Sequence, residues 1–190
     1  MKRFFLIAAM AVMSVAATAQ DFKWAYVDFN ELIMLMPEMD EARATLEENQ
    51  KTNEEILVAM YDEYQVKMQQ YQQKSSTWSA AIRESKEKEI VDIQTRLEQT
   101  QQNLQQEMQQ LQNSLQAPIY EKAQNAVNEL AKSKGLALVF EKNSLLYLDP
   151  AQGVDLTPEA RKVLNIPEGR TLESLQAELQ AKAQAAAQMQ

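Results

Sequence analysis

Two kinds of hydrophobic pattern occupy different stretches of the chain. Between residues 37 and 134 the apolar residues recur at steps of three and four, which predicts long amphipathic helices. Residues 24–29 and 136–148 instead contain short runs of aromatic, β-branched and aliphatic residues, which predict strands. The pattern therefore predicts a small strand-rich part whose sequence is interrupted by a long helical hairpin.

The first helix of the predicted hairpin begins at Pro37, because proline favours the first position of a helix. Asn49 and Asn53 fall within its apolar seam, where polar residues lower stability but can fix the register of packing. We expect the turn of the hairpin at residues 75–79, which read Ser-Ser-Thr-Trp-Ser. The other predicted members of the seam are Met39, Ala42, Leu46, Ile56, Met60, Tyr64, Met68 and Tyr71.

A heptad seam predicts the second helix. Pro118 lies inside this helix and predicts a kink or the start of a new helix, because proline removes a backbone donor. Lys132, Lys134 and then Gly135 predict where the helix ends. At 1.5 Å per residue, two helices of this length form a hairpin of roughly 60 Å or more. The heptad residues are Ile90, Leu97, Leu104 and Leu111, with Ile93 and Thr100 between them.

The segment after the hairpin predicts two more strands and a short helix. The strands are expected at residues 136–140 and 145–148, joined by a hairpin turn at 141–144. Thr157 is the expected N-cap of the helix, and Pro158 its first residue. So few short strands cannot bury a stable core alone, so we expect other copies of the chain to complete this part.

Residues 1–19 have the pattern of a cleaved secretory signal peptide. Lys2 and Arg3 precede an apolar run over 4–17, and Ala17-Thr18-Ala19 provides a cleavage site. This run is shorter than the ~20 residues that a transmembrane helix needs, although an uncleaved anchor is the alternative. No cysteine follows the run, which excludes lipoprotein processing.

Four regions follow from these patterns. We expect a signal peptide over residues 1–19, a β-rich body over 20–36 and 135–165, and an α-helical hairpin arm over 37–134 with its tip near 75–79. Residues 166–190 form an Ala/Gln-rich tail, for which we expect a weak helix or disorder. The predicted fold class is thus mainly α, with a small β body from which a long antiparallel coiled-coil hairpin emerges.

Composition argues against ordinary enzyme chemistry. The chain has no cysteine and no histidine, which excludes disulfides, thiolate metal sites, a cysteine nucleophile and the usual general base. An enzyme would have to rely on carboxylates and lysine. Asp28, Glu31, Asp149 and Asp155 lie in or near the body, but their spacing predicts neither an acid–base pair nor a cation loop. We therefore expect no catalytic residues, no metal and no cofactor.

Charge is negative overall but uneven along the hairpin. The chain has 19 Lys+Arg and 27 Asp+Glu, and removing Lys2 and Arg3 with the signal leaves 17 against 27, or −10. This balance argues against binding to nucleic acid. Residues 37–63 contain nine acids and two bases (−7), whereas residues 64–86 contain four bases and one acid (+3). The tip of the hairpin is therefore predicted to be positive and its shaft negative.

The order of these features resembles the Skp/OmpH family of periplasmic chaperones over about residues 22–165. The resemblance implies a homotrimer, in which the strands form a small β-barrel and three helical arms surround a cavity. It also implies an ATP-independent holdase that binds unfolded outer-membrane β-barrel proteins between its arms. The stretches that carry the resemblance are Ala25-Tyr26-Val27-Asp28, Met36-Pro37-Glu38, Ile82-Arg83-Glu84, residues 86–90, Pro118-Ile119, Gly135 before Val139, Asp155-Leu156-Thr157 and Val163-Leu164-Asn165.

Two sets of residues are candidates for client contact. Methionine and aromatic side chains near the tip make weak, adaptable contacts of the kind an unfolded client requires. In the resembling family, basic arm tips are associated with contacts to clients and anionic lipid, although a net charge of −10 argues against lipopolysaccharide or membrane contact here. The apolar candidates are Tyr61, Tyr64, Met68, Tyr71 and Trp78, and the basic candidates are Lys67, Lys74, Arg83 and Lys86.

Each of these hypotheses has a structural alternative. Met60, Tyr64, Met68 and Tyr71 are also expected if they only pack against the second helix. The four basic residues are also expected on any solvated surface. A hairpin without client binding would make the protein a structural envelope scaffold or spacer with a fixed folded partner.

Overall fold

The computed structural model describes residues 23–149 and 151–188. The signal peptide predicted at residues 1–19 lies outside the described residues. The chain divides into two compact units: unit 1 comprises the described residues up to Met34 and from Lys122 onwards, and unit 2 runs from Leu35 to Glu121. Within the described ranges, no helix has the length and apolar character needed to cross a membrane.

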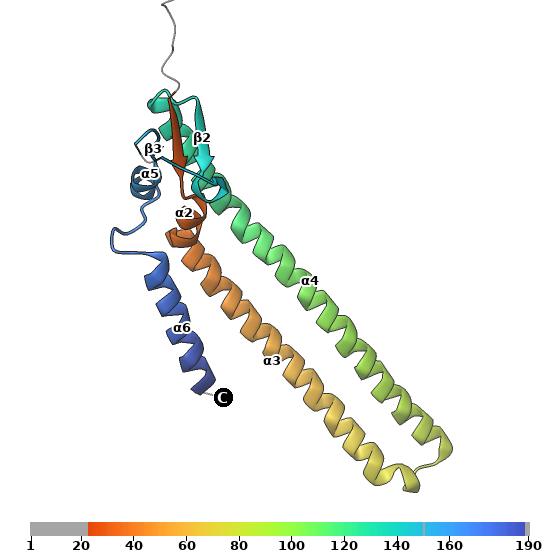
Figure 1. Ribbon diagram of the computed structural model, residues 1–190. Coiled ribbons are helices and arrows are strands. Elements are labelled where there is room, and N and C mark those ends of the chain that lie inside the picture. Colours follow the sequence, from red (N-terminus) through yellow and green to blue (C-terminus); the bar gives the residue numbers. More distant parts are fainter. Residues whose placement is uncertain (1–22, 150, 189–190) are drawn as a thin grey trace, which may run out of the picture. The chain divides into compact units, whose positions relative to one another are not determined.

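Unit 1 contains a three-stranded parallel sheet with β1 at its centre (Figure 1). β1 (Trp24–Val27) lies within the strand predicted at residues 24–29, and β2 (Leu138–Glu141) pairs with it along its whole length. On its other side β1 pairs with the two-residue strand β3 (Val154–Asp155). The last three residues of β1 are buried, as expected for the central strand of a parallel sheet.

The β-hairpin predicted over residues 136–148 is wrong. β2 runs parallel to β1 and is followed by the 3₁₀ turn η2 (Lys142–Ser144), while residues 145–148 belong to no strand. The turn is tied elsewhere, because the Glu141 carboxylate accepts hydrogen bonds from the backbone N–H of Phe29 at 2.9 Å and from the Asn143 side-chain amide at 3.2 Å. These bonds direct the chain towards the end of β1 instead of back along β2.

Asp28 links β1 to the short helix α2 (Phe29–Leu35). Its Oδ1 accepts the backbone N–H of Glu31 at 2.9 Å, which is the bond expected of a helix N-cap. Its own backbone N–H donates to the Thr157 hydroxyl at 3.0 Å. One residue therefore ends the central strand, starts a helix and joins both to a segment almost 130 residues away.

The helix α5 (Thr157–Val163) begins in a different way from the one predicted. Thr157 was expected to cap this helix with its own side chain, but its hydroxyl accepts the Asp28 N–H instead. The N-cap position is occupied by Leu156, and the preceding residue, Asp155, accepts the Thr157 N–H with its Oδ1 at 2.9 Å. The difference arises because the Asp28 N–H at the end of β1 needs an acceptor in a part-buried position.

The helix α4 (Ala80–Ser133) ends as its sequence predicts and continues through Pro118, where a kink or a new helix was predicted. Gly135 has φ +61°, and the next N–H bonds to the carbonyl of Ala131 at 3.0 Å, which is the pattern of a glycine C-cap. Pro118 lies inside the helix, which continues through it, so the prediction of a new helix is wrong. The missing N–H costs α4 one hydrogen bond, and the next residue, Ile119, is buried.

The core of unit 1 combines the sheet with apolar faces of four helical segments. Leu32 of α2, Leu156 before α5 and Leu164 after it are almost completely buried. The end of α4 contributes small residues that allow close packing. The other buried apolar residues of this unit are Ala25, Tyr26, Val27, Ala123, Ala126, Val127, Ala160, Ile166 and Leu175.

The tail contains a helix, α6 (Leu172–Gln188). Its start is fixed by a reciprocal pair of bonds: the Ser174 N–H donates to Thr171 Oγ1 at 3.1 Å, and the Thr171 N–H donates to Ser174 Oγ at 2.9 Å. Leu175 is 3% exposed and anchors the helix to unit 1. These contacts stabilise a sequence that would form only a marginal helix by itself.

Unit 2 is the helical hairpin (Figure 1). α3 (Pro37–Lys74) leads through the 3₁₀ turn η1 (Ser75–Thr77) and Trp78-Ser79 into α4, so the turn lies at the predicted Ser/Thr/Trp segment. Within this unit α3 and the part of α4 up to Glu121 run antiparallel.

Candidate functional site

The facing sides of α3 and α4 form a seam that is only partly buried. In α4 the predicted heptad is confirmed: Ile93 is 6% exposed, and Ile90, Leu97, Thr100, Leu104 and Leu111 are half-buried. In α3 the seam uses Leu57 where Ile56 was predicted, because Leu57 is half-buried and Ile56 is 40% exposed. Positions 53, 57, 60, 64, 67 and 71 of α3 thus alternate steps of four and three, the spacing of a coiled coil.

The polar residues predicted for the seam bond to each other. The side-chain amide of Asn53 donates to Asn49 Oδ1 at 3.2 Å, one turn away on α3. Both side chains are half-buried. The amides therefore satisfy part of their hydrogen bonding within α3 and leave this stretch of the seam polar.

Aromatic residues gather at the tip and along α3. Tyr71 and Trp78 contact edge to face with ring centroids 5.9 Å apart, and Tyr61 and Tyr64 lie 6.4 Å apart. The Tyr71 hydroxyl donates to the carboxylate of Glu87 on α4. This hydrogen bond, with a smaller contribution from burial, raises the pKa of Tyr71 above its ordinary value. Tyr71 and Trp78 are half-buried, so the tip has an ordered aromatic pair that is still open to solvent.

Two of the four predicted basic candidates are engaged in ion pairs. Lys86 and Lys67 both contact the Glu89 carboxylate, at 2.5 Å and 3.3 Å. Hydrogen bonds from Lys86 and then Lys67 lower the pKa of Glu89 below its ordinary value. Lys74 and Arg83 are exposed, and in the described part of the chain neither has an ion pair. Over residues 67–89 five bases face three acids, so the tip has a charge of +2.

An open apolar groove lies where the middle of α3 faces α4. It has a volume of about 300 Å³ and is lined by Leu57, Val58, Tyr61, Leu97 and Gln101. Val58 and Tyr61 are more than half exposed, at 59% and 54%. We name these five residues the hairpin groove. Sequence reasoning found Tyr61 but missed Val58, whose signal was an apolar residue directly beside the seam.

The two sides of the hairpin differ in chemistry. With ~100° between successive residues of a helix, Tyr61 lies about 40° to one side of Leu57 and Glu63 lies about 120° to the other. Two ion pairs join the helices on the Glu63 side: Glu63 to Arg96 at 2.5 Å, and Lys67 to Glu89 at 3.3 Å. The hairpin groove therefore opens on the side away from these ion pairs.

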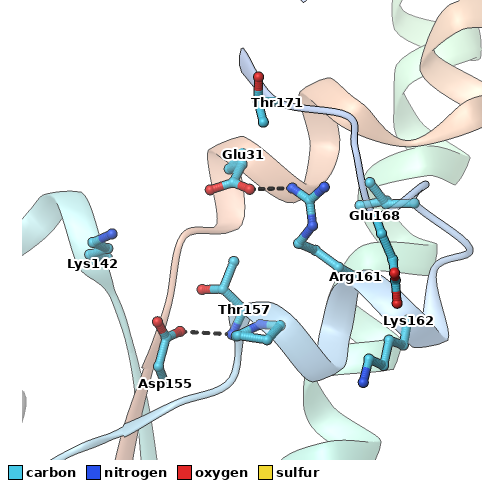
Figure 2. A pocket seen from close by; sticks show the side chains of 10 residues that line it. Glu31, Lys142, Asp155, Thr157, Arg161, Lys162, Glu168 and Thr171 are labelled. Atoms are coloured by element: carbon cyan, nitrogen blue, oxygen red, sulfur yellow. Dashed lines mark hydrogen bonds and ion pairs between the residues drawn. The ribbon is translucent and has the colours of Figure 1, made fainter. Parts of the chain in front are cut away.

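Unit 1 has a charged cleft of about 440 Å³, shown in Figure 2. The Arg161 guanidinium forms an ion pair with Glu31 of α2 and donates to the backbone carbonyls of Pro167, at 3.1 Å, and Arg170. Three acids and three bases line the cleft, so the formal charges of its lining cancel. Arg161 thereby joins α2, α5 and the start of α6, which gives the cleft a structural role. In the described residues no cluster of acidic side chains could hold a metal ion.

Comparison with known proteins places most of the chain in one group. The family model described as outer membrane protein (OmpH-like) matches residues 23–164. The chaperone protein Skp of Yersinia enterocolitica is 26% identical over 163 residues, covering 85% of this chain and 98% of that protein. The chaperone protein Skp of Pectobacterium atrosepticum is 26% identical over 164 residues, with the same coverage. The match to the family model ends before α6, so the tail helix lies beyond it.

Proposed function

The chain belongs to the OmpH-like family, and from this premise we propose that it is a periplasmic chaperone that holds unfolded outer-membrane β-barrel proteins without ATP. Two relatives that match over most of the chain are named chaperones, which favours this function over that of an envelope scaffold with a fixed partner. The observation that carries the proposal is the hairpin groove, an exposed apolar surface on one side of unit 2.

The chemistry of the hairpin suits a client that has no fixed structure. An unfolded chain offers many different apolar side chains, so its holder needs numerous weak contacts that can rearrange. Met60 and Met68 lie half-buried along α3, and methionine adapts its shape to varied neighbours. Together with Tyr64 they extend along α3 the apolar surface to which Tyr61 of the hairpin groove belongs. Its contacts are individually weak, so the client remains able to leave and fold.

Basic residues make a smaller contribution in this proposal. Lys67 and Lys86 share the Glu89 carboxylate and are half-buried, so Lys74 and Arg83 are the two of the four candidates whose side chains are exposed for contact with a client. Two exposed lysine or arginine side chains are a weak attraction for an anionic membrane when the chain as a whole carries −8. We therefore assign client capture chiefly to apolar contact.

We also propose that three copies of the chain assemble through unit 1. The sheet is small and its outer strands expose apolar side chains: Leu138 and Phe140 on β2, and Val154 on β3. Leu146 and Tyr147, just beyond β2, are almost wholly exposed. Burying this surface against other copies would complete a core that three short strands cannot form alone. Three arms would then contact one client and increase the affinity through avidity.

The test of chaperone function is suppression of aggregation. The protein from residue 20 onwards is mixed with a urea-unfolded outer-membrane β-barrel protein, the urea is diluted, and light scattering is followed. We expect scattering to be suppressed near equimolar trimer. Unchanged scattering at roughly tenfold excess would refute the proposal, because binding that weak could not hold a client.

A matched pair of variants tests the hairpin groove. Val58 lines the groove and is 59% exposed. Val66 lies on the same helix and is 51% exposed, but it is ~80° further round the helix axis, on the side that faces away from α4. We expect Val58→Ser combined with Tyr61→Ser to raise the amount of protein needed for suppression about threefold or more, and Val66→Ser to leave it unchanged. Equal effects of the two variants would mean that the groove is not the contact surface.

The proposed trimer has its own test. Multi-angle light scattering measures the mass of the assembly, and a folded monomer at micromolar concentration would contradict the trimer.

A further inference from the structure

A second apolar groove lies in unit 1, on the tail helix. It has a volume of about 440 Å³ and is lined by Met34 at the end of α2 and by one face of α6: Leu172, Leu175, Gln176, Leu179, Gln180 and Ala183. Leu175 forms its buried floor at 3% exposure, and Leu172 and Leu179 are 37% and 43% exposed. We name this set the tail groove. No charged side chain lines it.

The tail groove is a formed surface, because both of its walls are fixed. Arg161 binds Glu31 on α2 and the carbonyls of Pro167 and Arg170, which lead into α6. The reciprocal bonds between Thr171 and Ser174 then fix the first turn of α6. Binding of a ligand therefore requires little loss of conformational entropy in the walls of the groove.

The lining indicates what the groove binds. It resembles the hairpin groove in composition, since both combine leucine side chains with glutamine amides and lack charges: Gln101 in the hairpin groove, Gln176 and Gln180 in the tail groove. A glutamine amide can donate to and accept from the backbone of an extended peptide, while the leucines and Met34 contact its apolar side chains. An apolar segment of an unfolded chain fits both requirements.

A second copy of α6 fits less well. Helix pairing requires large apolar residues at successive seam positions along both helices. After Leu179 the seam of α6 continues with Lys182 or Ala183 and then Ala186, which bury little surface. The groove therefore has enough apolar area for a few side chains of a client but too little for a helix–helix interface.

We infer that the tail groove is a second client-binding site, which takes an apolar segment of the same unfolded protein that the hairpin groove holds. This inference rests on the proposed chaperone function and adds a site formed mainly by α6, which lies beyond the residues that match the family. Two sites on one chain raise the effective concentration of the client at each of them. The tail helix is thus a contributor to holding and not only an extension.

Site-specific photo-cross-linking tests the inference, because the chain has no cysteine and one introduced thiol can be labelled uniquely. A benzophenone maleimide is attached to Ala183→Cys, which lies in the tail groove, and to Ala181→Cys, which is on the same helix ~200° away. The probe client is a urea-unfolded outer-membrane β-barrel protein diluted into buffer. Gln101→Cys in the hairpin groove, labelled in the same way, reports on the proposed function independently.

We expect the label at 183 to give at least about fivefold more cross-linked client than the label at 181, and Leu179→Ser to reduce that yield severalfold. Val163→Ser, an exposed position of α5 outside the groove, is the control and should leave the yield unchanged. Circular dichroism verifies that each variant keeps its helix content. Equal yields at 183 and 181, with client cross-linked at 101, overturn the tail site alone. Cross-links between two copies of the chain at 183 also overturn it, and no client at 183 or at 101 overturns both proposals.

Discussion

The body and the hairpin are held together by different kinds of contact. In unit 1 the defining bonds join residues far apart in the sequence: Asp28 to Thr157 over 129 positions, and Glu31 to Arg161 over 130. In unit 2 the bonds between helices span fewer positions, 33 for Glu63 to Arg96 and 22 for Lys67 to Glu89. The hairpin can therefore form from local contacts, whereas the body requires the two ends of the chain to meet.

The two units also differ in how completely their side chains are buried. Unit 1 contains side chains that are wholly enclosed, among them Leu32, Leu156 and Ala160. Between residues 43 and 118, which form most of the hairpin, Ile93 is the one buried residue and the rest of the seam is half-open. Enclosed packing specifies one arrangement, while half-open packing can be replaced by contacts to a ligand. From this difference in burial we expect unit 1, the body, to be rigid and unit 2, the helical arm, to rearrange its packing more easily.

The largest difference should come from removing one leucine side chain from each unit. Leu156→Ala leaves a cavity at a fully buried position and should lower the free energy of unfolding of unit 1 by about 3 kcal/mol. Leu104→Ala, at a half-buried seam position, should cost unit 2 about 1 kcal/mol. Hydrogen exchange followed by mass spectrometry measures the two units separately. Similar losses in both units would mean that the hairpin seam is packed as tightly as the body.

A pair of arginine substitutions tests the ion pairs. Arg161→Met leaves the Glu31 carboxylate and two backbone carbonyls without their donor in a part-buried cleft, which should destabilise unit 1 by about 2 kcal/mol. Arg96→Met removes an ion pair whose side chains are about half exposed, so we expect a loss below about 1 kcal/mol in unit 2. Urea denaturation followed by circular dichroism gives both values. A larger loss for Arg96→Met would reverse the comparison.

Gly153 tests how tightly the small sheet is packed. A Cβ atom at this position would lie 2.6 Å from the Trp24 ring, so Gly153→Ala must shift the ring or β3 and should cost about 1–2 kcal/mol. The fluorescence of Trp24 reports the shift once Trp78→Phe has removed the only other tryptophan. Gly169→Ala is the matched control, since a Cβ there meets no atom within 4 Å. An unchanged Trp24 spectrum in Gly153→Ala would mean that this contact is loose.

Local signals explain which parts of the fold could be predicted. The helices follow from side-chain periodicity, and the end of α4 follows from Gly135, because both depend on residues close together in the sequence. The strands were harder, since pairing depends on distant partners. Residues 145–148 have the composition of a strand, but Glu141 and Asn143 bond to the start of α2 and turn the chain away. The bond from the Phe29 N–H to Glu141 joins residues 112 positions apart, so no pattern of neighbouring residues in the sequence predicts it.

The candidate site was predicted in outline and differs in detail. Periodicity identified the seam, but one step of the pattern was assigned to Ile56 where Leu57 faces α4. Counting charges identified a positive tip, but not that Lys67 on the opposite helix and Lys86 on the same helix share one carboxylate, that of Glu89. The side of the hairpin on which the groove opens depends on how the two helices face each other, which no single helix pattern contains.

The smallest effect we predict is a pH dependence at the tip of the hairpin. Hydrogen bonds from Lys86 and Lys67 hold the pKa of Glu89 below its ordinary value of 4.5. A carboxyl whose pKa is lower in the folded state stabilises that state above the unfolded pKa, and this contribution is lost as the pH falls through the folded pKa. The side chains of these pairs are 35–38% exposed and thus reach solvent, so the effect should be slight and should decrease with added salt.

The measurement compares the protein with Glu89→Gln. The difference in their thermal midpoints should be present at about pH 7 and disappear as the pH falls through the lowered pKa of Glu89, because protonation removes the same charge that the substitution removes. Glu98→Gln, an exposed position on the same helix, is the control and should behave like the unsubstituted protein. A difference that persists at low pH would show that Glu89 acts through packing and not through its charge. The tip would then be held by contacts like those of the body, and the contrast between a rigid body and an adaptable arm would end before the tip.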